Sequence, residues 1–216
     1  MIYITDYINK FEIEKNVFHP FKVFNWESKV TPYDKIKVLL VWHQKIDEKY
    51  LQNFQNLKGI IRYGVGYDNI DLEACKKNKI IFCNNPSYGV DEVSDTALSM
   101  IMYLTRAIGL YHYKCLNLLE NEDGSWQENT CKEAKRLNTL HLGVIGCGRI
   151  GTSLVRKSKE IFRSIGIYDP FLPSGFEKSV NVNRFDDLSS LLINSDIVSL
   201  HVPLKNDTRG LVNKKF

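Results

Sequence analysis

The sequence predicts an α/β protein that contains two parallel, doubly wound β-sheets. Short continuous apolar runs, such as residues 38–42 (VLLVW), have the character of strands buried on both faces. These runs alternate with segments of helical spacing, as the strands and helices of parallel sheets do. One long helical segment separates an earlier series of such units from a later one.

The first series becomes clear only after residue 35. Before it, residues 2–5 and 22–24 are candidate strands. The segments that follow in order are a strand at 38–42, a helix at 47–54, a strand at 57–62, a helix at 72–77 and a strand at 80–83. The loop after the second of these strands carries two glycines, Gly64 and Gly66, with one residue between them.

A long amphipathic helix is predicted next. Its apolar positions recur every three or four residues at Val93, Ala97, Ile101, Leu104, Ile108 and Tyr111. Acidic residues begin it, which suits the helix dipole, and the segment 121–125 (NEDGS) ends the pattern. We therefore expect a first domain at 1–88, a connecting long helix at 89–120 and a second domain at 121–216.

The second series predicts another parallel sheet. Its segments are a strand at 140–145, a helix at 150–162, strands at 165–168 and 180–184, a helix at 188–193 and a strand at 196–201. A doubly wound sheet that binds a dinucleotide has about six strands. Because these segments supply four, we expect the second domain to be incomplete within this sequence.

Composition excludes several classes of protein. The net charge is +4, with 29 basic and 25 acidic residues and no basic stripe, so we expect no nucleic-acid partner. No apolar run approaches the ~20 residues that cross a bilayer, so we expect no membrane partner. The five cysteines form no C-x-x-C pair, which predicts neither a disulfide framework nor a metal site. The first residues lack a signal-peptide pattern, and we expect a cytoplasmic protein.

The turn between the strand at 140–145 and the helix at 150–162 carries the clearest chemical motif. Gly146, Gly148 and Gly151 have the spacing G-x-G-x-x-G. The motif follows an apolar strand and opens an amphipathic helix, and Asp169 closes the next strand about 20 residues on. This context predicts a dinucleotide-binding βαβ unit, with a glycine-rich turn of an unrelated α/β protein as the alternative.

Each position of the motif has a physical reason in such a unit. The first glycine permits a tight turn, the second lets the backbone approach the pyrophosphate, and the third lets helix and strand pack closely. The N–H groups of the first helical turn then face the phosphates. Asp169 would accept hydrogen bonds from ribose hydroxyls and repel a 2′-phosphate, so NAD is favoured over NADP. Cys147 is interpreted as a small residue in a tight loop, with a redox-sensitive thiol as the alternative.

Six parts of the chain carry motifs of a known family. They are residues 62–71 (RYGVGYDNID), 85–86 (NP) with 90–98 (VDEVSDTAL), 124–126 (GSW), 142–151 (LGVIGCGRIG), 168–170 (YDP) and 201–204 (HVPL). In order and spacing, from about residue 36 onward, they resemble the D-isomer-specific 2-hydroxyacid dehydrogenases. That family includes D-3-phosphoglycerate dehydrogenases, glyoxylate/hydroxypyruvate reductases and C-terminal binding protein corepressors. The first 35 residues match it only loosely.

The resemblance implies a flavodoxin-like substrate domain followed by a Rossmann NAD-binding domain. It places the substrate carboxylate against the loop Gly64, Val65 and Gly66, where the backbone N–H groups of Val65 and Gly66 donate to it. The residues themselves agree, because α/β sheets bind ligands at the carboxyl ends of their strands. An ordinary tight turn, which would also carry glycines, is the alternative for this loop.

The resemblance also implies which residues contact NAD. They are Val65, Thr96, Gly146, Gly148, Arg149, Ile150, Gly151, Asp169, His201, Val202, Pro203 and Thr208. Thr96 would lie near the nicotinamide, although a threonine in mid-helix is usually just packed. His201 matches a strand-end residue near the cofactor and not the family's catalytic histidine.

The family's catalytic Arg, Glu and His have no match in these residues, and the resemblance places all three beyond residue 216. The segment 208–212 (TRGLV) looks like the family's arginine motif. Its spacing from His201 matches an earlier segment instead, so we expect that Arg209 is not catalytic.

These features indicate an NAD-dependent oxidoreductase that transfers a hydride between NAD(H) and a small 2-hydroxy or 2-keto acid. The alternative is a catalytically silent NAD-binding regulatory protein or a truncated remnant. Family members are usually dimers, which makes a homodimer the candidate assembly. The side chain of the substrate stays open at this stage: a phosphorylated one would need a cation, for which Arg62 and Lys35 are candidates.

Overall fold

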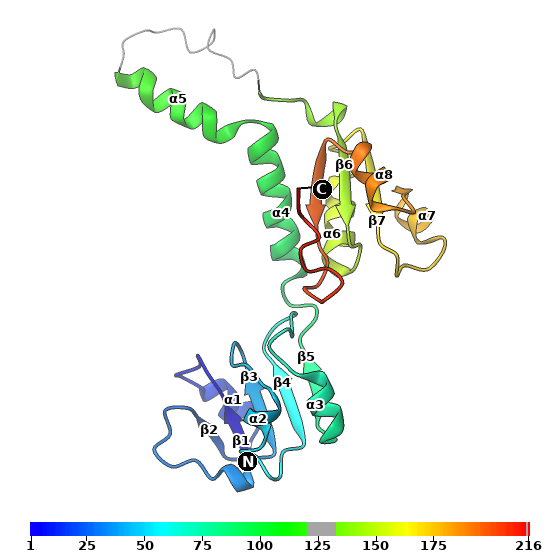
Figure 1. Cartoon of the computed structure of the whole chain (residues 1–216). Coiled ribbons are helices and arrows are strands. Elements are labelled where there is room, and N and C mark those ends of the chain that lie inside the picture. The colour runs from blue at the N-terminus through cyan, green and yellow to red at the C-terminus, as the bar shows by residue number, and fades with distance from the viewer. Residues whose placement is uncertain (121–132, 215) are drawn as a thin grey trace. The chain divides into compact units, whose positions relative to one another are not determined.

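The computed structural model describes residues 1–120, 133–214 and 216, and the side chains of 117–120 are outside the description. The chain forms two compact units, Met1–Gly89 and Val90–Phe216, each with one parallel sheet and flanking helices (Figure 1). The predicted α/β class with two parallel sheets is confirmed. The expected boundary at 121 and the segment 124–126 lie outside the described residues. Among the described residues, no helix has the length and apolar character needed to cross a membrane.

The first unit has a five-stranded sheet. Its elements in chain order are β1 (Ile2–Ile4), α1 (Glu12–Val17), β2 (Val23–Asn25), the 3-10 helix η1 (Tyr33–Lys35), β3 (Val38–Val41), α2 (Glu48–Leu51), β4 (Gly59–Arg62), α3 (Leu72–Lys77) and β5 (Ile81–Asn84). The strands lie in the order β2-β1-β3-β4-β5, and every neighbouring pair is parallel. This is the strand order of flavodoxin-like sheets.

The central strand β3 of the first sheet is buried on both faces. Leu39 and Val41 belong to one core cluster with Ile60, whereas Leu40, which lies between them, belongs to another with Ile4. Alternate side chains of a strand point to opposite faces of the sheet. The continuous apolar run at 38–41 is therefore what a strand between two layers requires, while Trp42 follows the strand and is exposed.

Two helices of the first unit differ from the expectation. α1 has no counterpart in the sequence pattern, because none of its side chains is buried and its residues show no apolar period. The helix expected at 47–54 spans only Glu48–Leu51. It begins where the Asp47 carboxylate accepts the N–H of Tyr50 at 2.9 Å.

The second unit has a four-stranded sheet. Its elements in chain order are α4 (Val90–Thr105), α5 (Ile108–Glu120), the 3-10 helix η2 (Leu137–Thr139), β6 (His141–Ile145), α6 (Arg149–Ser158), β7 (Ser164–Tyr168), α7 (Phe176–Val180), β8 (Asn183–Arg184), α8 (Leu188–Ile193) and β9 (Ile197–Leu200). The strand order is β8-β7-β6-β9, and all neighbours are parallel. With β6 as its first strand, this sheet has the 3-2-1-4 order of a Rossmann fold.

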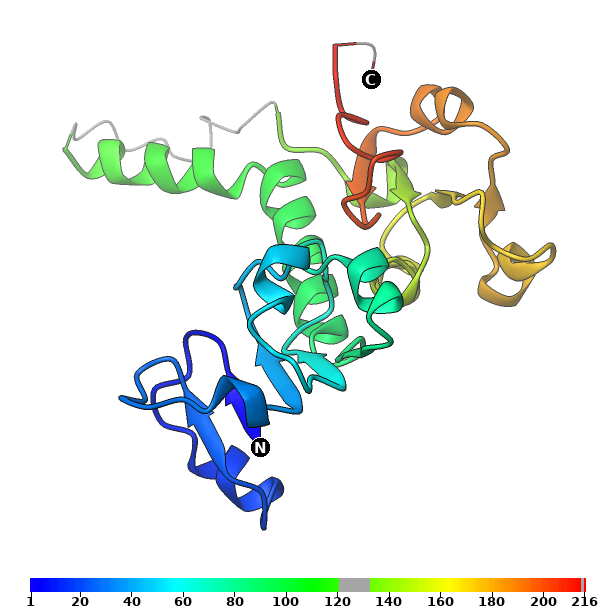
Figure 2. The same ribbon diagram turned by 60° about the horizontal axis from the view of Figure 1, so that its bottom comes forward.

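The long helix expected at 89–120 is two helices, so the prediction of one continuous helix is wrong. α4 ends at Thr105 and α5 begins at Ile108, and Figures 1 and 2 show them meeting at an angle. Ala107, between them, has a φ of 51°, which interrupts a right-handed helix. A Cβ on Gly109 would lie 2.2 Å from the hydroxyl oxygen of Tyr103, so glycine permits the close approach at this corner.

The core of the second unit lies between the sheet and the helices α4 and α6. It includes Val144 and Ile167 from the strands, Leu154 from α6, and Ala97 and Ile101 from α4. The apolar face predicted for the long helix is therefore real along α4. It packs α4 into the unit that contains the glycine motif.

β8 covers only part of the strand expected at 180–184. Residues 176–180 form α7 instead. Asn181 ends that helix with a left-handed backbone, at a φ of 50°.

Candidate functional site

The glycine loop (residues 146–151) joins β6 to α6 at the carboxyl end of the second sheet. Gly146 has a φ of 82°, and its N–H donates to the carbonyl of Tyr168 at 2.9 Å. A Cβ on Gly146 would lie 2.7 Å from the carbonyl oxygen of His201. A Cβ on Gly151 would lie 2.1 Å from the carbonyl oxygen of Gly146. Both positions therefore need glycine for the fold itself.

Gly148 differs from the other two glycines of the loop. Its φ is −71°, and among the described residues no atom other than those of Gly148 and its two chain neighbours lies within 4 Å of the place where its Cβ would stand. α6 begins directly after it, without a side-chain cap. The N–H groups of Arg149, Ile150 and Gly151 thus head a ten-residue helix, an arrangement that suits an anion. Open space at Gly148 and an uncapped helix start together fit the pyrophosphate of a dinucleotide.

Asp169 follows β7 beside the glycine loop. Its carboxylate accepts the N–H of Cys147 at 2.9 Å and the N–H of Phe171 at 3.0 Å. A carboxylate has about four acceptor sites, so capacity remains for the hydroxyls of a ribose. Arg184 donates to the carbonyls of Asp169 at 3.3 Å and Leu172 at 3.1 Å. Its guanidinium is thus engaged by main-chain oxygens, which supports NAD over NADP at this edge.

The residues after β9 lie against the same loop. The N–H of His201 donates to the carbonyl of Ile145 at 2.7 Å. Burial lowers the pKa of His201 below its usual value, so the ring is neutral at pH 7. Thr208 closes the following turn, where its hydroxyl donates to the carbonyl of Pro203 at 2.6 Å. Val202 lies so near the loop that its Cγ1 would be 2.7 Å from a Cβ on Gly146.

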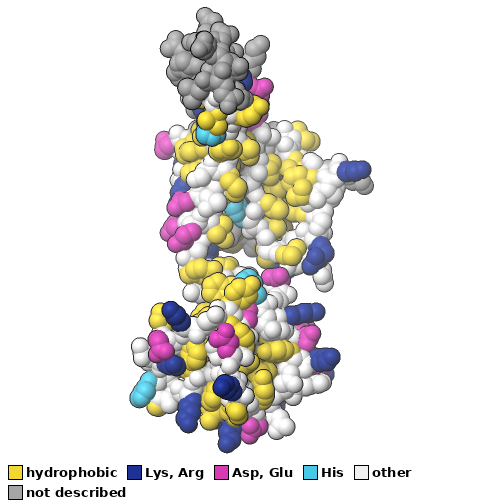
Figure 3. Space-filling model, turned by 90° about the vertical axis from the view of Figure 1, so that its left-hand side faces the viewer, with side chains coloured by type: hydrophobic (Ala, Val, Ile, Leu, Met, Phe, Trp, Pro, Cys, Tyr) yellow, Lys and Arg dark blue, Asp and Glu magenta, His cyan; other side chains and the backbone are white. Residues whose placement is uncertain are grey.

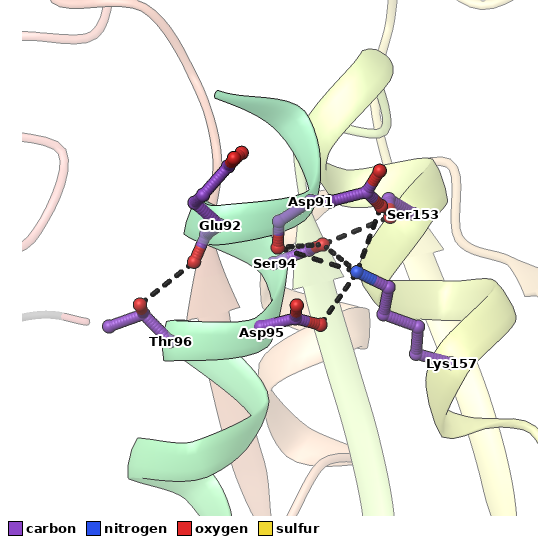
Figure 4. A network of polar contacts seen from close by, with 7 residues as sticks. All are labelled: Asp91, Glu92, Ser94, Asp95, Thr96, Ser153 and Lys157. Carbon is purple, nitrogen blue, oxygen red and sulfur yellow. Dashed lines mark hydrogen bonds and ion pairs between the residues drawn. The ribbon is translucent and has the colours of Figure 1, made fainter. Parts of the chain in front are cut away.

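Thr96 lies on α4 in the same unit. Its hydroxyl donates to the carbonyl of Glu92, one turn earlier, at 2.8 Å (Figure 4). Thr96 is exposed, and this is the contact of a mid-helix threonine whose hydroxyl bonds back to its own helix. A role for Thr96 near the nicotinamide stays a prediction.

A polar network joins α4 to α6, as Figure 4 shows. Nζ of Lys157 donates to the carboxylates of Asp95 at 2.7 Å and Asp91 at 3.0 Å, and to the hydroxyl of Ser94 at 2.8 Å. The hydroxyls of Ser94 and Ser153 are 2.9 Å apart. The hydrogen bond to Asp95 raises the pKa of Lys157 against the opposing effect of desolvation. The network therefore holds α6, which carries the N–H groups of the glycine loop, against α4.

In the first unit, the loop after β4 is fixed by its own contacts. Gly64 has a φ of 143°, a backbone conformation that residues with a side chain rarely adopt, so this position favours glycine. The side-chain amide of Asn84 donates to the carbonyl of Val65 at 2.8 Å. Within the described part of the chain, the N–H groups of Val65 and Gly66 make no hydrogen bond. The loop thus offers two donors at the carboxyl end of the first sheet, which supports the ligand-binding interpretation over an ordinary turn.

Cys147 lies between two glycines of the glycine loop. Its side chain is buried, and Sγ is 3.7 Å from the hydroxyl of Thr152. Burial is the main cause that raises the pKa of this thiol, and the carboxylate of Asp169 acts in the same direction. A buried thiol with a raised pKa is unreactive. The structure supports Cys147 as a small packing residue.

Comparison with known proteins decides the family. Residues 98–216, more than half of the chain, match the model of the D-isomer specific 2-hydroxyacid dehydrogenase, NAD binding domain. The chain belongs to the D-isomer specific 2-hydroxyacid dehydrogenase family. The predicted family and the predicted cofactor, NAD, are both confirmed, and the glycine loop lies within the family's NAD-binding domain.

Curated relatives of this dehydrogenase-family chain are only partly covered by it. It is 32% identical to C-terminal-binding protein 1 of Caenorhabditis elegans over 176 residues, which are 81% of this chain and 24% of that protein. It is 32% identical to D-3-phosphoglycerate dehydrogenase of Methanocaldococcus jannaschii over 171 residues, which are 79% of this chain and 31% of that protein. The chain thus spans about a quarter to a third of these relatives.

A solved structure of the family shows the same fold. D-lactate dehydrogenase from Aquifex aeolicus, crystallised with NAD and lactic acid, superposes with a TM-score of 0.80 at 26% sequence identity. The superposition covers 96% of this chain and 62% of that one.

Three residues that hold these loops carry no signal in the sequence motifs. They are Asn84, Arg184 and Lys157, and each acts through a partner on another element. Lys157, for example, is 62 positions from Asp95. Only the folded chain brings such pairs together.

Proposed function

We propose that the whole protein is an NAD-dependent oxidoreductase that transfers a hydride between NAD(H) and a 2-hydroxy or 2-keto acid. The observation that carries this is the uncapped start of α6 behind Gly148, beside the carboxylate of Asp169. The family match and the dehydrogenases among the similar proteins support a catalytic rather than a silent NAD-binding protein.

The cofactor contacts follow from this placement. The N–H groups of Arg149, Ile150 and Gly151 bind the pyrophosphate, and Asp169 binds the ribose next to the adenine. The residues after β9, His201, Val202, Pro203 and Thr208, line the adenosine side. Bound NAD supplies the hydride acceptor, while this chain orients the dinucleotide.

The substrate contacts lie in the first unit, which we assign as the substrate domain at residues 1–88. The N–H groups of Val65 and Gly66 donate to the substrate carboxylate. We assign binding and not proton transfer to these residues. Arg209 sits in the turn after β9, where its N–H donates to the carbonyl of Lys205 at 2.9 Å, and is not the catalytic arginine.

Two glycine substitutions test the cofactor site. Gly148→Ala puts a methyl group into open space, so the chain should fold as before. That methyl group lies where the pyrophosphate approaches, and we expect NADH to bind at least about tenfold more weakly. Gly89→Ala, also into open space, is the matched control and should bind NADH like the wild type. Titration of NADH fluorescence measures both, and wild-type affinity in Gly148→Ala would overturn the assignment.

We also propose that the protein forms a homodimer in the cytoplasm. Apolar side chains are exposed on α4 and α5, among them Leu104 at 73% and Tyr113 at 65%, and Figure 3 shows apolar side chains on this surface. The described cysteines are free thiols, as in reducing compartments. Leu104→Lys should convert a dimer to a monomer in sedimentation velocity. Ile13→Lys, at an exposed apolar position on α1, should not, and a monomeric wild type would refute the dimer.

A further inference from the structure

Four aromatic rings gather at the carboxyl end of the first sheet. This aromatic cluster consists of Tyr7, which follows β1, Trp42 and His43, which follow β3, and Tyr63, which follows β4. β1, β3 and β4 are neighbours in the sheet, so the three chain segments emerge side by side. The ring centroids of Tyr7 and His43 are 5.1 Å apart, those of Tyr7 and Trp42 6.4 Å, and those of Trp42 and Tyr63 6.3 Å.

Asp6 fixes the backbone beneath the cluster. Its carboxylate accepts the N–H groups of Trp42 at 3.0 Å, His43 at 2.5 Å and Gln44 at 2.9 Å, and the hydroxyl of Thr5 at 2.6 Å. Burial acts to raise the pKa of Asp6, but these hydrogen bonds outweigh it and lower the pKa below its usual value. The ionised carboxylate thus accepts hydrogen bonds from three consecutive main-chain N–H groups. The segment that carries Trp42 and His43 is therefore held in one conformation.

The cluster is exposed and adjoins the loop with the free N–H groups. Tyr7 is 71% exposed and Trp42 40%. Tyr63 directly precedes Gly64, and its hydroxyl donates to the carboxylate of Glu14 at 3.1 Å. A ligand whose carboxylate binds Val65 and Gly66 would therefore have its side chain within reach of these rings.

Charge at this edge disfavours a phosphorylated ligand. Lys35 ends η1 before β3, so it lies at the amino end of the sheet, opposite to the cluster. The guanidinium of Arg62 donates to the carbonyl of Tyr63 at 2.8 Å. The carboxylates of Asp6 and Glu14 stand next to the rings instead. An anionic side chain would meet two carboxylates and one guanidinium that already donates to a main-chain carbonyl, whereas an apolar one would meet aromatic faces.

We propose that the aromatic cluster is the subsite for the substrate side chain, and that the protein acts on 2-hydroxy or 2-keto acids with an aromatic or bulky apolar side chain. This inference rests on the proposed placement of the substrate carboxylate at Val65 and Gly66. Trp42 is the main contact, because it touches both Tyr7 and Tyr63. Asp6 is a positioning residue that acts through the backbone of Trp42 and His43.

Nuclear magnetic resonance titration of the 216-residue chain tests the proposal. The probes are phenylpyruvate, pyruvate and 3-phosphohydroxypyruvate, and the amide signals of Val65 and Gly66 report binding of each. We expect phenylpyruvate to bind at least about tenfold more tightly than pyruvate and to shift the indole signal of Trp42. 3-Phosphohydroxypyruvate should bind no more tightly than pyruvate.

Matched variants identify the subsite. Trp42→Leu should bring the phenylpyruvate-to-pyruvate affinity ratio close to one, while Trp42→Phe should keep most of it. Tyr33→Leu, at an exposed aromatic position on η1, should leave the ratio unchanged. Equal affinity for the three acids, no binding of any, or an unchanged ratio in Trp42→Leu would overturn the proposal.

Titration of the same sample with NADH distinguishes a failure of the aromatic subsite from a failure of the proposed function. NADH binding that perturbs the amide of Gly148, together with a phenylpyruvate-to-pyruvate ratio near one, would leave the proposed cofactor site standing and refute only the subsite. Failure to bind NADH would count against the proposed function itself.

Discussion

The three glycines of the glycine loop are glycine for different reasons. Gly146 adopts a left-handed backbone, and Gly151 lies too close to a carbonyl oxygen for any side chain. Gly148 has an ordinary φ and open space around it, so no contact within the described part of the chain requires glycine there. The fold explains two of the three positions, and the open space at the third fits the proposed approach of the dinucleotide.

Replacing Gly151 tests the fold-based reason. In Gly151→Ala the new Cβ would lie 2.1 Å from the carbonyl oxygen of Gly146, so the loop or α6 must move. Overpacking of this kind costs about 1–3 kcal/mol, and we expect urea unfolding to show a loss of that size together with weaker NADH binding. Gly148→Ala should bind NADH more weakly without the loss of stability. Equal stability of the two variants would contradict this distinction.

Asp6 should make stability depend on pH. Its pKa is lower in the folded chain than in the unfolded chain, so its contribution is complete above the unfolded value of about 3.9 and is lost as the pH falls through the folded value. Asp6→Asn removes the charge that the three N–H groups bind. The destabilisation it causes should therefore be largest near pH 7 and shrink below pH 4. Denaturant unfolding over pH 3–7 measures this, with Asp34→Asn on η1 as the control for losing one negative charge.

At the scale of elements, the sequence predicts those strands, turns and helices that have a pattern in their own residues. The strand, glycine turn and helix from β6 to α6 are predictable because a buried strand, three spaced glycines and an amphipathic helix each have a local signature. The break between α4 and α5 at Ala107 is not predictable, since the apolar period of α4 continues through Ile108 and Tyr111. The same holds for α1, whose side chains are all outside the core.

The candidate site is likewise predictable only where a local pattern of residues reports it. Asp169 is predictable from its distance to the glycines, but its hydrogen bond to the N–H of Cys147 is not. The aromatic cluster depends on the order β1-β3-β4, which places Tyr7 beside Trp42 and Trp42 beside Tyr63. No sequence period reports which strands are neighbours. Contacts between side chains of different elements therefore cannot be predicted from a local sequence pattern and are seen only in the folded chain.

The Lys157 network should contribute to the packing of α4 on α6. Lys157→Met removes the cation that three side chains of α4 bind, so we expect the melting temperature to fall by about 3 °C. The loss should shrink in 1 M NaCl, because salt screens the exposed carboxylates of Asp91 and Asp95. Lys159→Met, an exposed lysine on the neighbouring turn, is the matched control. Equal losses for both variants would show that the network is not structural.

At the scale of the whole molecule, the chain has two separate cores. The clusters around Leu39 and Leu40 belong to Met1–Gly89, and the cluster around Val144 belongs to Val90–Phe216. The second of these units holds the glycine loop, Asp169 and the residues after β9. The first holds the loop with the two free N–H groups and the aromatic cluster. The proposed cofactor contacts and the proposed substrate contacts thus belong to units with their own hydrophobic cores.

Separate cores predict that NADH stabilises one unit more than the other. A ligand that binds only the folded state adds about 2.7 kcal/mol at a concentration 100 times its Kd. At that concentration, the slowest amides of β6 and β7 should exchange hydrogen about 100-fold more slowly, whereas those of β3 and β4 should be nearly unchanged. Hydrogen exchange followed by mass spectrometry measures both sets in one sample. Equal protection of the two sheets would mean that the units unfold together, and protection of β3 and β4 alone would move the cofactor site out of the glycine loop.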